Sequence, residues 1–92
     1  MDFEYDRRKS ETNKAKHGID FEEAKALWED TDRIQLRAIL NGEERFPIIG
    51  QIAGKHWTTI VTYRGNRVRI ISVRRSRERE VQLYEKNKHG GV

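Results

Sequence analysis

Two groups of residues in this sequence could do chemistry on a phosphate. His17 closely follows Lys14 and Lys16, and the segment Arg64–Arg79 holds seven arginines against a single acid, Glu78. An imidazole exchanges protons near neutral pH, and guanidinium groups bind phosphate oxygens through paired N–H donors. If folding brings the two groups together, they would supply proton transfer and charge stabilisation for phosphoryl chemistry.

His17 is expected at the end of a polar helix. The stretch RRKSETNKAKHG carries almost no large apolar residue, and its cations fall in the last turn, where they suit the helix dipole. Gly18 is the expected terminator of this helix. Taken alone, a histidine in this position is more often a partner of the dipole than a catalytic group.

A second helix is expected directly after Gly18. Asp20 can cap it, and Glu23 completes a capping box three residues later. The apolar residues of this segment recur on one side, which predicts a stripe that packs on a sheet. That stripe consists of Phe21, Ala24, Leu27 and Trp28.

Most of the remaining chain is expected to form strands. A short strand is predicted over residues 3–6, and residues 33–40 alternate apolar and polar side chains up to a turn at Asn41-Gly42. Three further β-branched runs follow, FPIIGQIAG, HWTTIVTY and RVRIISV. Pro47 lacks a backbone N–H, so it should lie in an edge strand or at the start of a strand.

A last helix is predicted after Ser76, its expected cap, with Val81 and Tyr84 facing inward. The order of elements is therefore β-α-α-β-β-β-β-α. This order indicates an α+β fold, with an antiparallel sheet and helices packed against it. We expect a single domain over residues 1–86 and a flexible C-terminal tail over residues 87–92.

The arginine run conflicts with the expected secondary structure unless an anion is nearby. Strand alternation places Arg74 and Arg75 on opposite faces, so only one of them can point into a given site. Arg77 and Arg79 would lie in the first turn of the last helix, where the dipole disfavours cations. A bound phosphate would remove this conflict. Alternatively, the helix start is solvated and acids such as Glu78 balance the arginines.

The composition narrows the classes of function. The 92 residues include no cysteine, and the three histidines lack the spacing of a metal site, so we expect neither a metal nor another cofactor. The net charge of +4 and the pI of about 9.6 favour a polyanionic partner such as RNA or DNA. The sequence shows no apolar signal segment or membrane span, and we expect a cytoplasmic protein without a membrane partner.

Several other residues are candidate contacts to RNA. Trp57 and Arg64 each belong to an aromatic and cationic stretch that could stack on bases, and Arg45 follows two acids in GEERF. Trp57 could equally pack in the core, and Arg45 could form a solvent-exposed ion pair. We include these three residues, with Lys14 and Arg77, as expected substrate contacts.

Three sequence blocks resemble, in order and spacing, those of BrnT, the toxin family of type II BrnT–BrnA toxin–antitoxin systems. The blocks are NKAKHGIDFEEA, GEERFPIIG and RVRIISVRRSREREVQLYE, and the resemblance spans residues 3–85. It implies a RelE-like fold and a metal-independent endoribonuclease that cleaves RNA and inhibits translation. The catalytic candidates at matching positions are Lys16, His17, Arg74, Arg75 and Arg79. Ser76, Arg77 and Glu80 depart from the commoner pattern of alanine, threonine and arginine.

The resemblance also implies partners. These are a BrnA-like ribbon-helix-helix antitoxin in a 2:2 heterotetramer, the RNA substrate, and operator DNA contacted through the antitoxin. Two alternatives remain on the sequence alone: a non-catalytic basic module that binds nucleic acid or a partner protein, and a purely structural subunit. Loss of RNA cleavage on substitution of His17 would distinguish the enzyme from both.

Overall fold

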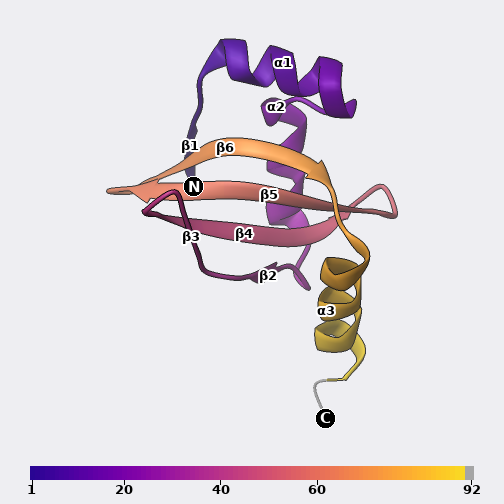
Figure 1. Ribbon diagram of the computed structural model, residues 1–92. Coiled ribbons are helices and arrows are strands. Elements are labelled where there is room, and N and C mark those ends of the chain that lie inside the picture. The colour runs from indigo at the N-terminus through magenta and orange to yellow at the C-terminus, as the bar shows by residue number, and fades with distance from the viewer. Residues whose placement is uncertain (91–92) are drawn as a thin grey trace.

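Strands β4, β5 and β6 form the centre of the structure, a computed structural model that describes residues 1–90 (Figure 1). In chain order the elements are β1 (Asp2–Glu4), α1 (Arg7–His17), α2 (Phe21–Ala24), the 3-10 helix η1 (Lys25–Glu29), β2 (Ile34–Gln35), β3 (Ala38–Leu40), β4 (Glu43–Ile52), β5 (Lys55–Arg64), β6 (Arg67–Arg75) and α3 (Glu78–His89). The predicted α+β class and order of elements are confirmed.

The sheet has the order β1-β6-β5-β4-β2, with β3 paired to β4 beside β2. β4, β5 and β6 are antiparallel neighbours, whereas β1 pairs in parallel with residues 67–69 of β6. Beyond residue 69, α1 takes the place of a strand and lies along the edge of β6 (Figure 1).

The core lies between the sheet and α2. The predicted apolar stripe is confirmed: Phe21, Ala24 and Leu27 are at most 1% exposed, and Trp28 is half-buried. They pack with strand residues such as Val61 and Val73. Gly50 allows η1 to approach the sheet closely, because an added Cβ would lie 2.7 Å from a methyl carbon of Leu27.

The start of α2 follows the prediction in detail. The Asp20 side chain accepts from the Glu23 backbone N–H at 2.7 Å, and the Glu23 carboxylate accepts from the Asp20 N–H at 3.0 Å. Gly18 ends α1 with φ +80°, a left-handed conformation that side chains other than glycine adopt at a cost. Together these residues fix a tight turn directly after His17.

Two expectations about the strands are wrong. Residues 33–40 form two short strands, β2 and β3, in place of one. Pro47 lies inside β4, an internal strand, and not at an edge or a strand start. The two corrections have one origin, since β2 pairs with β4 at residues 48–49 and β3 at residues 43–45. Pro47 therefore lies opposite the interruption between them, where a missing N–H donor costs least.

The ends of α3 also differ from expectation. Arg77, and not Ser76, occupies the position before the first helical residue, while the Ser76 hydroxyl lies 2.8 Å from that of Thr58. At the other end α3 continues to His89, so residues 87–89 of the expected tail are helical. Residues 91–92 of that tail lie outside the described residues. Tyr84 is 1% exposed and faces inward, as predicted.

Candidate functional site where α1 meets the end of β6

The Asn13 side chain fastens α1 to the edge of β6. Its amide nitrogen donates to the carbonyl oxygens of Val73 and Ile19, both at 2.8 Å, and its oxygen accepts from the Val73 N–H at 3.2 Å. The Asn13 amide thus satisfies the backbone groups that a neighbouring strand would otherwise bind. Since Asn13 is only 6% exposed, these bonds are shielded from water.

His17 lies one turn beyond Asn13, on the same side of α1. The helix begins just after β1, which pairs with residues 67–69, and reaches Val73 at Asn13, so α1 and β6 run in the same direction (Figure 1). One helical turn advances about 6 Å, and the two strand residues from Val73 to Arg75 advance about 7 Å. The fold therefore brings half-buried His17 and Arg75 to the same corner.

Arg75 shares this corner with Trp57. The two residues are partners in the register of β5 and β6, and the guanidinium carbon lies 5.4 Å from the centre of the indole ring. Arg75 Nε also donates to the carbonyl oxygen of His56 at 3.3 Å. Because Arg75 is exposed, its remaining N–H groups face solvent and could bind an anion.

Arg74 points to the opposite face of the sheet and is bound there to Glu80. Its Nη1 and Nη2 atoms donate to the two carboxylate oxygens at 2.7 and 2.9 Å, and the two side chains are 22% and 15% exposed. Arg74 therefore does not share the corner of His17. The expectation that only one of the two arginines points into a given site is met, and Arg75 is the one beside α1.

Glu80 supplies the anion that the start of α3 requires. Its carboxylate accepts from the Arg77 backbone N–H at 2.8 Å and from the Thr58 hydroxyl at 3.1 Å, in addition to Arg74. The ion pair with Arg74 is the main cause that lowers the pKa of Glu80 to about 2. The helix start is thus balanced by an acid of the chain, but by Glu80 and not through the expected pair between Arg74 and Glu78.

The remaining candidates divide between the two ends of the sheet. Lys16 in the last turn of α1 and both Arg77 and Arg79 at the start of α3 are exposed and belong to the end that carries His17. Lys14 is at this end too, but its Nζ is bound to Glu23 at 2.7 Å, and this hydrogen bond raises the lysine pKa.

Arg45 and Arg64 lie at the far end. Arg64 is seven residues from Trp57 along β5, a distance of about 23 Å in an extended strand. Its Nη1 lies 3.9 Å from the Glu4 carboxylate, and the Arg45 guanidinium is bound to Glu43. The structure therefore does not bring these two residues together with His17.

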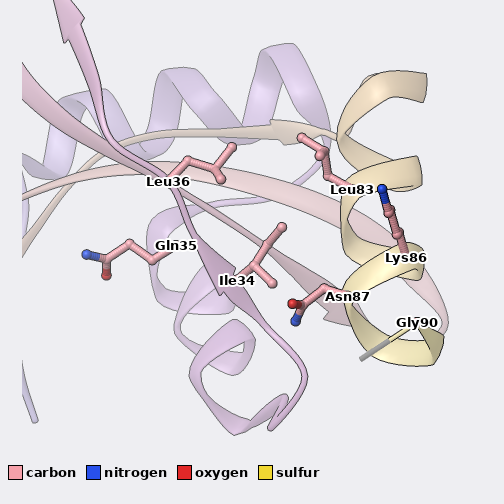
Figure 2. A pocket seen from close by; sticks show the side chains of 7 residues that line it. All are labelled: Ile34, Gln35, Leu36, Leu83, Lys86, Asn87 and Gly90. Atoms are coloured by element: carbon pink, nitrogen blue, oxygen red, sulfur yellow. The ribbon is translucent and has the colours of Figure 1, made fainter. Parts of the chain in front are cut away.

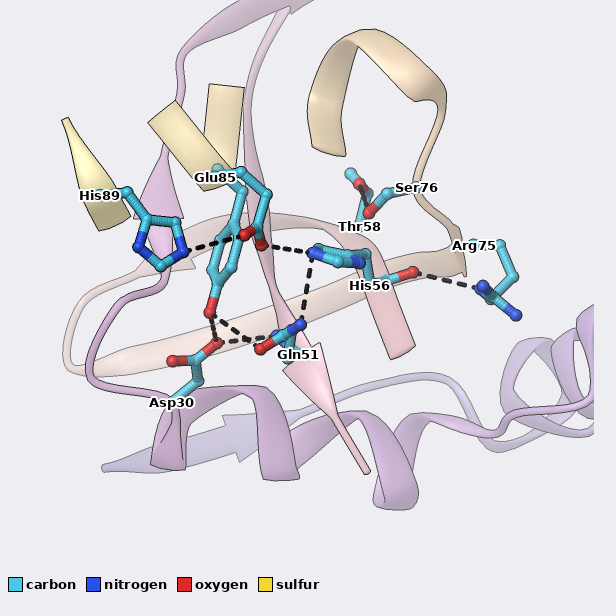
Figure 3. Close-up of polar contacts among 9 residues, drawn as sticks. Asp30, Gln51, His56, Thr58, Arg75, Ser76, Glu85 and His89 are labelled. Carbon is cyan, nitrogen blue, oxygen red and sulfur yellow. Dashed lines mark hydrogen bonds and ion pairs between the residues drawn. The ribbon is translucent and has the colours of Figure 1, made fainter. Parts of the chain in front are cut away.

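Two positioning features were missed by the sequence reasoning. One is Asn13, whose spacing of four residues from His17 was the available signal. The other is a polar network beneath α3, in which His56 Nε2 lies 2.8 Å from Glu85 and the Tyr84 hydroxyl donates to Asp30 at 2.7 Å (Figure 3). Burial, together with this hydrogen bond, raises the Tyr84 pKa. These partners are distant in sequence, and no short motif announces them.

Within residues 1–90, no three acidic or histidine side chains are grouped so that they could hold a metal ion. Nor does that part of the chain contain a helix of the length and apolar character that a membrane crossing requires. The chemistry available at the corner is that of His17, the nearby cations and the aromatic ring of Trp57.

Comparison with known proteins agrees with the sequence blocks noted above. A search among curated proteins found no match. The family model described as "Ribonuclease toxin, BrnT, of type II toxin-antitoxin system" matches residues 5–80, which is well over half of the chain and includes α1, the sheet and the first turn of α3. The chain therefore belongs to the BrnT family of ribonuclease toxins, whose partners in type II systems are protein antitoxins.

Proposed function

We propose that this toxin is a metal-independent endoribonuclease whose active site is the corner where α1 meets the end of β6. The observation that carries the proposal is the binding of Asn13 to Val73, because it places His17 beside Arg75. The toxin cuts cellular RNA and thereby inhibits translation.

The proposed reaction needs no external nucleophile. The RNA 2′-oxygen attacks the adjacent phosphorus as its proton passes to a base, and the P–O5′ bond breaks as O5′ takes up a proton. The products are a 2′,3′-cyclic phosphate and a 5′-hydroxyl. His17 transfers one of these two protons, as general base or general acid, while Lys16 and Arg75 stabilise the extra negative charge on the phosphorane oxygens.

The surrounding residues suit binding of a single strand of RNA. The Trp57 ring with Arg75 beside it forms a surface on which a base can stack, and exposed Arg77 and Arg79 can bind the neighbouring phosphates. Arg74 is assigned a structural role, because Glu80 already occupies both edges of its guanidinium. This narrows the set of five catalytic candidates to those that face solvent at the corner.

The antitoxin in this proposal is a BrnA-like ribbon-helix-helix protein. It forms a 2:2 heterotetramer with the toxin and contacts operator DNA through its own DNA-binding domain. The support for this partner is the family membership of the chain.

The test is incubation of purified toxin, free of antitoxin, with a long single-stranded RNA in excess EDTA. Wild-type protein and Arg64→Ala, whose side chain lies at the far end of the sheet, should cut the RNA and leave cyclic phosphates. His17→Ala should bind the RNA without cutting it. Intact RNA with wild-type protein would favour the non-catalytic binding module, and cleavage that stops in EDTA would refute the metal-independent mechanism.

A further inference from the structure

One face of the sheet is only partly covered. α2 and η1 pack on one face, whereas on the opposite face α3 lies at one end (Figure 1). Two adjacent rows of side chains show where the cover stops. Ile49 and Thr58, paired across β4 and β5, are 0% exposed beneath α3. In the next row, Pro47 and Ile60 are paired in the same way but are only half-buried.

A groove of about 540 Å³ opens beside this second row, between β2 and α3. Figure 2 shows Ile34 and Leu36 of the edge segment on one side and Leu83 of α3 on the other. Leu83 is 39% exposed, and Leu40, which strand alternation places on the same face, is 47% exposed. Apolar side chains thus continue from the groove along the sheet edge, a pattern typical of an interaction surface.

The charges around this groove are mostly positive. Lys86 lines it, and no ion pair within residues 1–90 involves this lysine. Farther along the same face, three arginine side chains surround the single carboxylate of Glu4, at distances of 3.9, 3.9 and 2.8 Å. Those arginines are Arg64, Arg67 and Arg69. A partner that fits this face therefore carries apolar side chains flanked by carboxylates.

We propose that this face, which we call the α3 groove, is the docking surface for the protein antitoxin. The antitoxin contributes an acidic amphipathic segment whose apolar side chains contact Leu36 and Leu83 and whose carboxylates meet Lys86. The α3 groove and the corner of His17 and Arg75 belong to different faces of the sheet. Antitoxin binding and RNA cleavage should therefore be separable by substitution. The proposal depends on the family membership and not on the proposed active site.

The test compares two leucine variants with a matched control on the same edge of the sheet. Leu83→Lys and Leu36→Lys place a cation in the α3 groove, whereas Ile39→Lys changes an exposed residue on the other face of β3. The antitoxin of the same system is titrated into each toxin by calorimetry. We expect the Kd to rise about tenfold or more for the two leucine variants and to stay within about twofold for Ile39→Lys. RNA cleavage by the free Leu83→Lys toxin should match wild type.

A measurement on the wild-type complex covers the case in which a variant fails to fold. Hydrogen exchange should show new protection over residues 34–40 and 80–89 when the antitoxin is bound, with little change over residues 7–12. Unchanged antitoxin affinity in Leu83→Lys, or protection confined to α1, would overturn the proposal. So would a wild-type toxin that dimerises on its own in sedimentation and becomes monomeric in Leu83→Lys, because the groove would then hold a second copy.

Discussion

Arg74 and Arg75 are neighbours in the chain, yet the end of β6 gives them different surroundings. Arg74 is held by both oxygens of Glu80 and is 22% exposed, on the face that carries α3. Arg75 lies over Trp57 on the other face, near the end of α1, with its Nε on a backbone carbonyl and its remaining donors in solvent. The alternation of a strand has separated two identical side chains into one that stabilises the fold and one that is free to bind an anion.

The comparison shows why a cluster of arginines is ambiguous in sequence. A helix start and a phosphate make the same demand, because each needs opposite charge and planar hydrogen-bonding partners. Here the chain meets the demand at α3 with Glu80, and leaves Arg75 for a ligand. The contrast between the two faces can be broken or sharpened by the substitutions that follow.

The largest effect is expected for His17→Ala. Loss of a proton-transfer group should lower the rate of RNA cleavage by about 10²- to 10⁴-fold, since general acid–base catalysis contributes on that scale. Gel-based cleavage assays measure the rate, and fluorescence anisotropy with uncleavable 2′-deoxy RNA measures binding, which should change by less than about threefold. A His17→Ala protein that cleaves at the wild-type rate would remove this residue from the site.

Arg75→Ala and Arg74→Ala should have opposite profiles. Arg75→Ala should lower kcat by about 10²-fold with little change in unfolding free energy, because it removes transition-state stabilisation from an exposed position. Arg74→Ala should lower the unfolding free energy by about 2 kcal/mol, because Glu80 is left without its partner, and should change kcat only severalfold. Urea denaturation and single-turnover cleavage on both variants decide. The reverse pattern would assign the phosphate to the α3 face.

The ion pair of Arg74 and Glu80 also predicts a pH dependence of stability. The Glu80 pKa is lowered from 4.5 to about 2 in the folded state, so its contribution is fully present above pH 4.5 and is lost as the pH falls towards 2. Its size is about 2 to 3 kcal/mol. The difference in unfolding free energy between wild type and Glu80→Gln should therefore shrink as the pH falls from 5 to 2. A difference independent of pH over this range would contradict the assignment.

Asn13→Ala tests whether α1 is positioned by the edge of β6. The substitution leaves a buried N–H and two carbonyl groups without partners, which should cost about 2 kcal/mol of unfolding free energy. Thr12→Ala, an exposed neighbour, should change stability by less than about 0.5 kcal/mol. If Asn13 also positions His17, the variant's kcat should fall under conditions where it is fully folded, with KM nearly unchanged.

The smallest effect is expected for Arg79→Ala. An exposed arginine that contacts phosphate should contribute a few-fold in RNA affinity, and its loss should reduce the slope of log Kd against log salt by about one. The matched control is Arg7→Ala, an exposed arginine at the opposite end of α1. Equal salt slopes for wild type and Arg79→Ala would place the RNA elsewhere on the molecule.

Much of the local structure could be predicted because its causes are local. The termination of α1 at Gly18 and the capping box of Asp20 and Glu23 depend on residues within one helical turn. The strands and the stripe of α2 follow from side-chain periodicity. The errors arose where a neighbour in space decides. Pro47 is tolerated inside β4 because the opposite edge strand is interrupted there, and Ser76 is not the cap because Thr58 binds its hydroxyl.

The sequence by itself determined the elements, the residues that could do chemistry, and the family resemblance, all of which depend on identity and spacing along the chain. Only the tertiary structure decided which of these residues meet. Asn13 and Val73 are 60 positions apart, and His17 and Arg75 reach one corner because those two distant residues are hydrogen-bonded. Pairing between distant segments depends on the packing of the whole sheet, so neither the choice of Arg75 over Arg74 nor the location of the α3 groove is encoded in any short stretch.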